Sequence, residues 1–409
     1  MLDGDDDLAR RANDGAPLST PGRYTCHLDP RKIDPDAAKV VRRLVRHGYE
    51  AYLVGGGVRD LLLGRTPKDF DVCTSARPED VQRLFRNSRI IGRRFRLAHV
   101  IFSGGKVIET ATFRRSPTPE EKSDDDLLIR RDNFFGRADE DANRRDFTIN
   151  ALFYDLEARQ VIDWCGGVAD LQRRSVRTIG DPLVRFMEDP VRILRAIKFS
   201  ARLDLGIAPS VYNAMVQCRG ALAMAARPRL FEELLRLLRE GAAQVSFWLA
   251  WETGTLDVLL PELSSYLYDR DPEDDSFWSI LREVDEQTAE RGEAFDDIVL
   301  LTCLLFEPML EACSGAADAP AAAVNFLEPI VERLSVPRRV ADAIRRIVAQ
   351  LPRMHAGRTG RFAQTSLYTM ARDVMGLLGQ SQSKLDTYLQ TTPKKRRRKK
   401  KAQRGDSAS

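Results

Sequence analysis

The spacing of hydrophobic residues changes near Ser175, and this change predicts a molecule of two parts. Before it, short apolar runs alternate with amphipathic segments and with glycine or proline turns; beyond it, the spacing is helical almost to Tyr388, with no further strand. We therefore expect an α+β protein, with a small mixed β-sheet in a head and then an all-α neck and body. The head pattern predicts helices over 37–47, 58–63 and 78–85, and strands over 51–55, 69–73, 98–102 and 106–113.

Composition and charge divide the chain of 409 residues further. Such a length exceeds one ordinary core, so two to four packed units are expected. An acidic start, Asp3 to Asp7, precedes the first helix, and a run of eight basic residues lies near the end. We predict these parts: a flexible N-terminal segment 1–33, a head 34–175, a helical neck 176–245, a helical body 246–390 and a disordered basic tail 391–409.

The basic tail is suited to bind RNA. It contains Lys394, Lys395, Arg396, Arg397 and Arg398 in sequence, with too little apolar surface to form a core. Such side chains bind phosphates without regard to base sequence and in a salt-sensitive way. A solvated tail without a function is the plain alternative. The rest of the chain favours a flexible RNA-binding arm.

Cysteine usage and hydropathy indicate a protein of the cytoplasm. Six cysteines are scattered without a Cys-x-x-Cys pair, which favours reduced, packed thiols over disulfides or a zinc site. No apolar run approaches the length of a membrane span, and no signal peptide is visible at the first residues. We therefore expect a cytoplasmic protein that contacts no membrane.

Asp69 and Asp71 carry the strongest chemical signal. Residues i and i+2 of a strand point to the same face, so the two carboxylates would lie side by side while Phe70 turns into the core. Adjacent like charges need a cation, and carboxylate oxygens suit Mg²⁺ that arrives with the phosphates of a nucleotide. A solvated strand end is the plain alternative.

A glycine cluster, Gly55 to Gly57, precedes this strand and opens a short helix. Free N–H groups at the start of a helix can receive phosphate. The run is not a dinucleotide-binding fingerprint, because Asp60 stands where the third glycine belongs, and no Walker glycine–lysine loop occurs. A glycine turn followed by a strand with two aspartates therefore predicts nucleotidyl transfer.

This order resembles the DNA polymerase beta superfamily of nucleotidyltransferases, whose members place a Gly-Gly or Gly-Ser turn before Asp-x-Asp. The segments 53–64 and 67–71 are similar to the class II branch, which contains bacterial poly(A) polymerases and CCA-adding tRNA nucleotidyltransferases. The resemblance spans about residues 20 to 380. It implies a polymerase-beta-like nucleotidyltransferase head followed by a helical neck and body.

The resemblance also implies roles for individual residues. Glu109 interrupts an apolar strand, where a charge that discourages aggregation is the alternative, and the class II pattern has a glutamate metal ligand at this place. Asp69, Asp71 and Glu109 would then hold two Mg²⁺ ions that activate the RNA 3′-hydroxyl and stabilise the pyrophosphate leaving group. The triphosphate would lie against Gly55, Gly56 and Arg59. Arg59 can equally be a surface arginine with a packed stem.

Two further motifs are similar to those of the class II branch. Arg145 adds charge for a phosphate, and Asp146 with Asn150 offers hydrogen bonds to a ribose hydroxyl; Asp146 can equally cap a helix. Asp189 and Arg192 share a face if they lie on one helix. An aspartate accepts from an exocyclic amine while an arginine donates to a ring nitrogen, so this pair would select adenine or cytosine. An N-terminal cap with an internal ion pair is the plain alternative.

The segment 90–100 favours a poly(A) polymerase over a CCA-adding enzyme. It is similar to the signature of the bacterial polymerases, and its arginines, Arg93, Arg94 and Arg96, can hold RNA phosphates. Basic loops beside aromatic residues are also often only solvated.

The function that the sequence predicts is Mg²⁺-dependent, template-independent addition of adenylate from ATP to RNA 3′ ends. By resemblance, this activity promotes RNA decay, which makes the decay machinery a candidate partner. A CCA-adding enzyme is the nearest alternative, and a non-catalytic RNA-binding protein of the same fold is the second. The sequence leaves the oligomeric state open.

Overall fold

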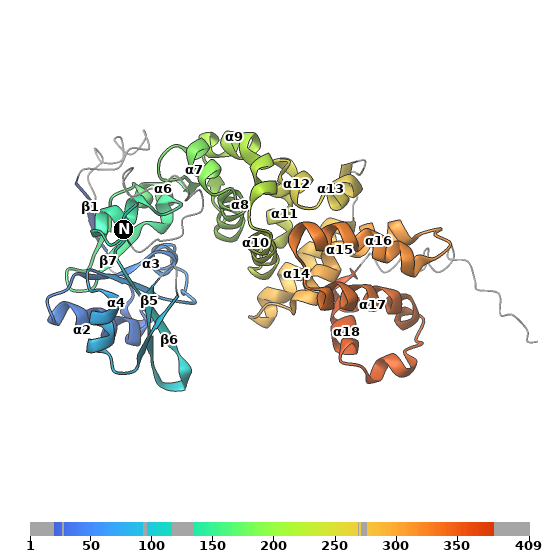
Figure 1. Ribbon diagram of the computed structural model, residues 1–409, viewed down its shortest axis with the longest axis horizontal. Helices are drawn as coiled ribbons and strands as arrows, with labels where there is room; N and C mark the ends of the chain where they lie inside the picture. Colours follow the sequence, from blue (N-terminus) through green and yellow to red (C-terminus); the bar gives the residue numbers. More distant parts are fainter. Residues whose placement is uncertain are drawn as a thin grey trace, which may run out of the picture. The chain divides into compact units, whose positions relative to one another are not determined.

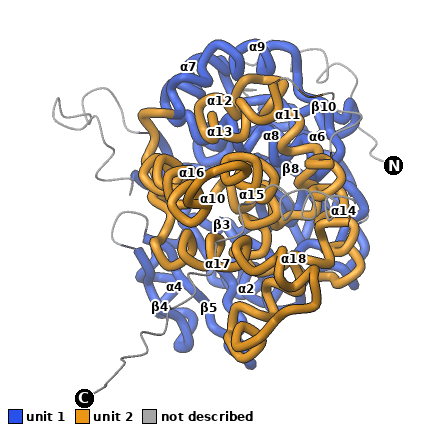
Figure 2. Tube along the Cα trace, turned by 90° about the vertical axis from the view of Figure 1, so that its right-hand side faces the viewer, with its two compact units in different colours: residues 1–222 blue, residues 223–409 orange. Residues whose placement is uncertain are grey.

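The computed structural model describes residues 20–26, 28–92, 96–116, 134–268, 270 and 276–379. The chain forms two compact units, Met1–Leu222 and Ala223–Ser409, which are coloured separately in Figure 2. The first unit contains the β-sheet and its surrounding helices, and the described part of the second unit is helical throughout (Figure 1). The α+β fold predicted from the hydrophobic spacing is confirmed.

The first unit is built on an eight-stranded mixed sheet with the strand order β1-β8-β7-β2-β3-β6-β5-β4. The neighbours β3 and β6 run parallel, and the other neighbouring pairs run antiparallel. A separate pair of short parallel strands, β9 and β10, lies outside this sheet. The strands are β1 (Gly22–Thr25), β2 (Ala51–Val54), β3 (Asp71–Thr74), β4 (Ser88–Ile91), β5 (Leu97–Ile101), β6 (Val107–Thr112), β7 (Leu152–Asp155), β8 (Gln160–Asp163), β9 (Ser175–Val176) and β10 (Gly206–Ile207).

Local sequence signals set the helix boundaries in this unit. The carboxylate of Asp34 accepts hydrogen bonds from the backbone N–H groups of Asp36 and Ala37 and so caps α2, with Pro35 at its first position. Gly48, at φ +83°, follows the helix end. The helices of the unit are α2 (Pro35–Arg46), α3 (Gly56–Leu62), α4 (Pro78–Leu84), α5 (Ala138–Asn143), α6 (Gly167–Gln172), α7 (Pro182–Glu188), α8 (Arg192–Leu203) and α9 (Pro209–Cys218), with 3-10 turns η2 (Pro30–Lys32), η3 (Ser103–Gly105), η5 (Thr148–Asn150) and η6 (Arg219–Met224).

Aromatic side chains fill the core between the sheet and α5. Phe153 lies edge-on to Trp164 at 5.2 Å and also contacts Phe113 and Tyr52. Such pairs add about 0.5–1.5 kcal/mol each beyond the burial of their apolar area. This core supports β2 and β7, the strands next to the glycine turn.

The structure has more strands than the sequence predicts, both in the sheet and outside it, and these strands correct three expectations. β1 lies inside the segment 1–33 that was expected to be flexible, where it pairs with β8. β9 and β10 contradict the prediction that no strand follows Ser175. β4, β7 and β8 were not predicted at all. These strands have two to four residues, too few for a periodic signal, and depend on pairing with distant segments.

The second unit packs its helices around α15, which contacts α14, α16, α17 and α18. Leu300, Leu304 and Phe306 of α15 are fully buried. Among the described residues, no helix is both long and apolar enough to cross a membrane. The helices are α10 (Arg227–Arg239), α11 (Ala243–Glu252), α12 (Thr255–Leu259), α13 (Pro261–Tyr268), α14 (Ser276–Arg291), α15 (Asp297–Cys313), α16 (Ala319–Leu334), α17 (Arg338–His355) and α18 (Leu367–Leu377), with the turn η7 (Gly360–Gln364).

The cysteines have the state that their scatter predicts. All six are free and buried, at Cys26, Cys73, Cys165, Cys218, Cys303 and Cys313. The predicted boundaries of neck, body and tail stay predictions, since the structure divides the chain only once, after Leu222.

Candidate active site

The central strands of the sheet carry the predicted carboxylates. Phe70 is buried, whereas Asp69 and Asp71 on either side of it are exposed, as the alternation of a strand requires. Asp69 lies two residues before Asp71, the first residue of β3. Glu109 lies on β6, the parallel neighbour, and Asp71 and Glu109 each precede the paired residues Val72 and Thr110 by one position. The two carboxylates therefore come from matching positions on adjacent strands.

These carboxylates disfavour one another's charge. The pKa of Asp71 is raised from 3.8 to about 6, first because surrounding protein removes its carboxylate from water, and then because Glu109 and Asp69 repel it, against an opposing effect of Arg145. Asp71 lies near other carboxylates and is still accessible to solvent. Such a set of oxygen donors fits a divalent cation, which would relieve the repulsion.

The carboxylates do not form a closed metal site by themselves. Within the part of the chain that the structure describes, no three side chains of His, Cys, Asp or Glu lie close enough together to hold a metal ion. Glu109 instead lies beside His99 of β5, with 3.5 Å between its Oε1 and the imidazole Nε2. The assignment of Asp69, Asp71 and Glu109 as metal ligands stays a prediction.

A cavity of about 470 Å³ opens beside Asp71 in the first unit. It brings together seven residues that the sequence analysis selected and three that it did not select. The predicted lining residues are Gly55, Gly56, Arg59, Asp71, Arg145, Asp146 and Asn150, and the additional ones are Arg144, Arg195 and Phe199. Four arginines thus face one space with Asp71 at its edge.

The glycine turn brings backbone and arginine close together at this cavity. Gly55 has φ +72°, a conformation that disfavours side chains, and a Cβ atom there would lie 3.0 Å from Nη1 of Arg145. A Cβ at Gly57 would lie 3.1 Å from the carbonyl oxygen of Asp69. Glycine is therefore needed both for the turn before α3 and for the packing of α3 against the segment that leads into β3.

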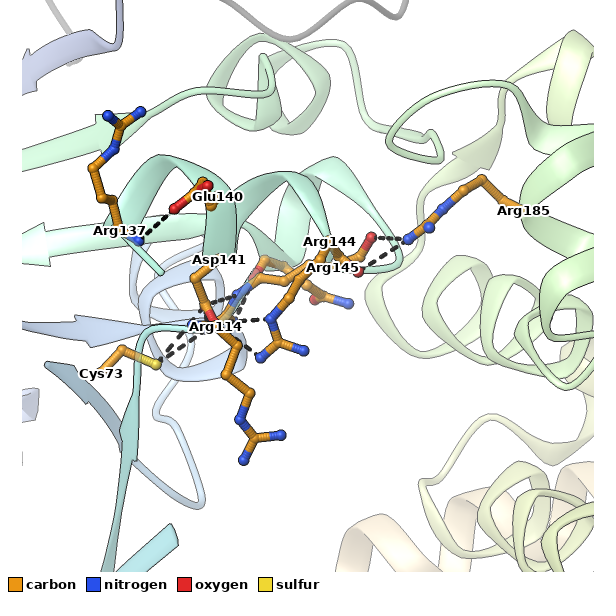
Figure 3. Close-up of polar contacts among 9 residues, drawn as sticks. Cys73, Arg114, Arg137, Glu140, Asp141, Arg144, Arg145 and Arg185 are labelled. Atoms are coloured by element: carbon orange, nitrogen blue, oxygen red, sulfur yellow. Dashed lines mark hydrogen bonds and ion pairs between the residues drawn. The ribbon is translucent and has the colours of Figure 1, made fainter. Parts of the chain in front are cut away.

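Arg144 and Arg145 share one buried carboxylate. Asp141 of α5 accepts from Nε and Nη2 of Arg144 at 3.0 and 2.9 Å, and from Nη2 of Arg145 at 3.0 Å, as the dashed lines in Figure 3 show. Arg145 also donates to the carbonyl oxygen of Asn150 and to Sγ of Cys73. One negative charge cannot neutralise two guanidinium groups, so this side of the cavity favours an anion.

Arg59 is not the surface arginine that was one alternative. Its side chain is buried, with the residue only 2% exposed. Its guanidinium donates to Asp60 at 2.7 and 2.8 Å and to Oδ1 of Asn150 at 2.6 Å, and it lies 5.1 Å from the ring of Phe199. Arg59 is thus fixed in place while it still lines the cavity.

Asp146 connects the hydrogen bonds around Asn150 to α8. It accepts from Nδ2 of Asn150 at 3.1 Å, from the backbone N–H of Phe147 at 2.8 Å and from Nε of Arg195 at 2.7 Å. Burial alone would raise the pKa of Asp146, but the ion pair with Arg195 and these hydrogen bonds outweigh it and lower the pKa to about 2. The proximity of Asp146 and Asn150 expected from sequence is present, although Asn150 ends a 3-10 turn, Thr148–Asn150, and Asp146 lies before it.

Asp189 and Arg192 do not meet the condition of lying on one helix. α7 ends at Glu188, Asp189 is extended at φ −149°, and α8 begins at Arg192. The reason is Pro190, which disfavours helical backbone at the residue before it. Arg192 donates to Glu188 at 3.1 Å and to the carbonyl oxygen of Arg185 at 2.9 Å. Neither residue of the predicted base-selecting pair lines the cavity.

α7, which leads into the junction with α8, nevertheless lies against the segment that carries Arg144 and Arg145. Arg185 of α7 donates to the backbone carbonyl groups of Arg144 and Arg145, which Figure 3 also shows. Burial, followed by the neighbouring charge of Arg192, lowers the pKa of Arg185. Asp189 and Arg192 follow directly along the chain.

Several predicted RNA-binding residues lie outside the described residues: Arg93, Arg94, Lys394, Lys395, Arg396, Arg397 and Arg398. Arg96 is described, and its guanidinium pairs with Glu79 of α4 at 2.6 Å. Both side chains are largely exposed, so this ion pair is worth little.

The sequence analysis missed three of the residues that line the cavity, for two different reasons. Arg144 adjoins Arg145 in the same motif, and its charge was the available signal. Arg195 and Phe199 lie on α8, where an amphipathic helix predicts core packing for the phenylalanine. Only the fold brings α8 to the cavity, where the Phe199 ring lies 5.1 Å from Arg59 and 5.4 Å from Arg195.

Comparison with known proteins decides the family. Residues 51–177 match the model of the poly A polymerase head domain, and residues 204–267 match a probable RNA and SrmB-binding site of polymerase A. Poly(A) polymerase I of Salmonella typhimurium is 38% identical over 377 residues, which cover 87% of this chain and 80% of that protein. The chain belongs to the poly(A) polymerase family. It is therefore a nucleotidyltransferase.

Other relatives of this poly(A) polymerase family member are CCA-adding enzymes. That of Geobacillus stearothermophilus is 38% identical over 229 residues, covering 56% of this chain and 55% of the relative. Among solved structures, a tRNA nucleotidyltransferase complexed with a primer tRNA and an incoming ATP analogue has a TM-score of 0.58 at 25% identity, covering 86% of this chain and 97% of that one. The predicted nucleotidyltransferase fold is thereby confirmed.

Proposed function

We propose that the protein adds AMP from ATP to RNA 3′ ends without a template and releases pyrophosphate. The observation that carries this proposal is the cavity that unites Asp71 with four arginines. Nucleotidyl transfer needs anion binding for a triphosphate next to carboxylates for metal ions, and the two features meet here.

The predicted residues would contribute in two ways, by binding charged groups and by positioning the reacting atoms. Gly55, Gly56 and Arg59, with Arg145, would hold the triphosphate so that its α-phosphate faces the RNA 3′-hydroxyl in line with the leaving pyrophosphate. Asp69, Asp71 and Glu109 would hold two Mg²⁺ ions, which when bound would lower the pKa of the hydroxyl and neutralise charge on the leaving group. No covalent intermediate with the protein is required.

The remaining predicted residues would recognise the nucleotide beyond its phosphates. Asp146 and Asn150, already hydrogen-bonded to each other, offer their remaining capacity to a ribose hydroxyl. Asp189 and Arg192 would select the base outside the cavity, at the junction of α7 and α8. Their donor and acceptor pattern accepts adenine or cytosine and rejects guanine and uracil.

The extent of sequence similarity, as distinct from similarity of fold, supports adenylation over CCA addition. Poly(A) polymerase I covers 87% of the chain, whereas the CCA-adding enzyme covers 56%. All three predicted carboxylates are present, which argues against a binding protein without catalysis. RNA as partner is supported by the matched RNA-binding model and by the tRNA nucleotidyltransferase solved with a primer tRNA. Tails of this kind would promote RNA decay in the cytoplasm.

The test is incubation of the full chain with Mg²⁺ and each single nucleotide in turn. One labelled RNA is generic and the other is a tRNA that ends before its CCA. Long tails from ATP alone on the generic RNA are the expected result, and Asp71→Ala should abolish them while RNA binding persists. Addition limited to CTP, CTP and ATP on the tRNA would show a CCA-adding enzyme. Absence of any incorporation would leave a binding protein.

A further inference from the structure

Arg202 lies outside the cavity but reaches the carboxylate that orients Arg59. Oδ1 of Asp60 accepts from Nε and Nη2 of Arg59 at 2.8 and 2.7 Å, and Oδ2 accepts from Nη2 of Arg202 at 3.0 Å. Asp60 is 4% exposed, so these contacts are shielded from water. One carboxylate, next to the glycine turn, thus serves an arginine of α3 and an arginine near the end of α8.

Sharing Asp60 changes the electrostatics of the cavity. A single negative charge that is divided between two guanidinium groups neutralises Arg59 less than an exclusive ion pair would. Burial lowers the pKa of Arg59, and the charge of Arg202 adds to this effect while Asp60 opposes it. A buried cation that is incompletely neutralised is unfavourable by itself and is stabilised by an anion. Arg59 lines the cavity, so an anion there can supply that charge.

We propose that Arg202 is a positioning residue for the nucleotide triphosphate, acting through Asp60 without touching the nucleotide. By drawing Asp60 toward the end of α8, it leaves the positive charge of Arg59 available to phosphate. This inference rests on the proposed function, because the anion is the triphosphate of the substrate. It assigns to the end of α8 a role in nucleotide affinity.

A purely structural clamp between α3 and α8 predicts a different result. Arg202→Met and Asp60→Asn both break the clamp, so a clamp predicts that both weaken anion binding alike. The proposal predicts opposite signs: Arg202→Met leaves Asp60 entirely to Arg59 and lowers the affinity, whereas Asp60→Asn keeps an oxygen acceptor for Arg59, removes the competing negative charge and does not lower it. Arg202→Lys restores a positive charge and should retain most of the affinity.

The experiment measures binding of inorganic triphosphate to the full chain by titration calorimetry. Arg202→Met should bind on the order of fivefold more weakly, as expected for one charge that acts over about 10 Å with partial screening. The KM for ATP should rise by a similar factor with kcat unchanged. Arg174→Met is the matched control, since Arg174 pairs with Asp204 near the same end of α8 but makes no contact with Asp60 among its described bonds.

Wild-type affinity in Arg202→Met, or equal weakening in Arg202→Met and Arg174→Met, would overturn the proposal. So would equal weakening in Arg202→Met and Asp60→Asn. If Asp60→Asn does not fold, the affinities of Arg202→Met, Arg202→Lys and Arg174→Met for triphosphate still test the proposal. Adenylate incorporation by the wild type is scored separately, so a failure of the proposed function is recognised independently of this result.

Discussion

Replacing Asp71 by asparagine should make the protein more stable while it abolishes activity. Asparagine keeps the shape and polarity of the side chain but removes the charge, which is disfavoured first by the loss of contact with water and then by repulsion from Glu109 and Asp69. A carboxyl group whose pKa is raised on folding destabilises the folded state whenever it is ionised. The penalty is fully present above the folded pKa of about 6 and vanishes below the unfolded value of 3.8.

The magnitude follows from those two pKa values. The difference between 3.8 and about 6 would correspond to about 3 kcal/mol for a carboxylate shielded from water. Asp71 is exposed, so solvent screening reduces the expected gain to about 1 kcal/mol. We expect the free energy of unfolding of Asp71→Asn to exceed that of the wild type by this amount at pH 7.5. The difference should shrink between pH 6 and pH 4.

Urea unfolding in the presence of a chelator, at several pH values from 4 to 8, measures this difference. Glu290→Gln, which neutralises an exposed carboxylate of α14, is the control and should show no comparable gain. The reasoning is refuted if Asp71→Asn is no more stable than the wild type at pH 7.5. A gain that persists unchanged at pH 4 would equally refute it, because the charge repulsion is then absent.

Three further substitutions test other parts of the site. Asp146→Asn should lower the free energy of unfolding by about 2 kcal/mol at pH 7.5, measured with urea; the ionised group stabilises fully above pH 3.8, and this contribution is lost as the pH falls through about 2. Gly55→Ala should weaken ATP binding and lower the melting temperature more than Gly64→Ala, since both have positive φ but only Gly55 lies against Arg145. Glu109→Gln should abolish Mg²⁺-dependent incorporation in an RNA extension assay. Metal-free binding of inorganic triphosphate should stay within about twofold of the wild type, and a larger loss would show a structural role of Glu109 instead.

Much of the site could be predicted because its signals are local. The alternation of Asp69, Phe70 and Asp71 needs only the geometry of one strand. The glycine turn needs only a positive φ. The short apolar runs indicated four of the eight strands of the sheet, but not how the strands pair. β1 illustrates this limit, because its four residues become a strand only through β8, far along the chain.

The differences at α7 and α8 have another cause. A shared face for Asp189 and Arg192 depended on one continuous helix, and Pro190 between them marks the break that the structure has after Glu188. Arg195 and Phe199 could not be assigned to the cavity, nor Arg202 to its surroundings, because a residue on an amphipathic helix gives no indication of what the helix packs against. Their contacts with Asp146, Arg59 and Asp60 exist only in three dimensions.

The lining of the cavity extends along the chain from Gly55 to Phe199, and this span bears on synthesis of the protein. A ribosome makes about 5–20 residues each second, and N-terminal segments emerge first. Asp69, Asp71 and Glu109 therefore leave the ribosome well before Arg195, Phe199 and Arg202. Until α8 has emerged, the nascent chain carries the carboxylates but lacks part of the cavity lining. A chain whose translation stops before α8 therefore has an incomplete cavity.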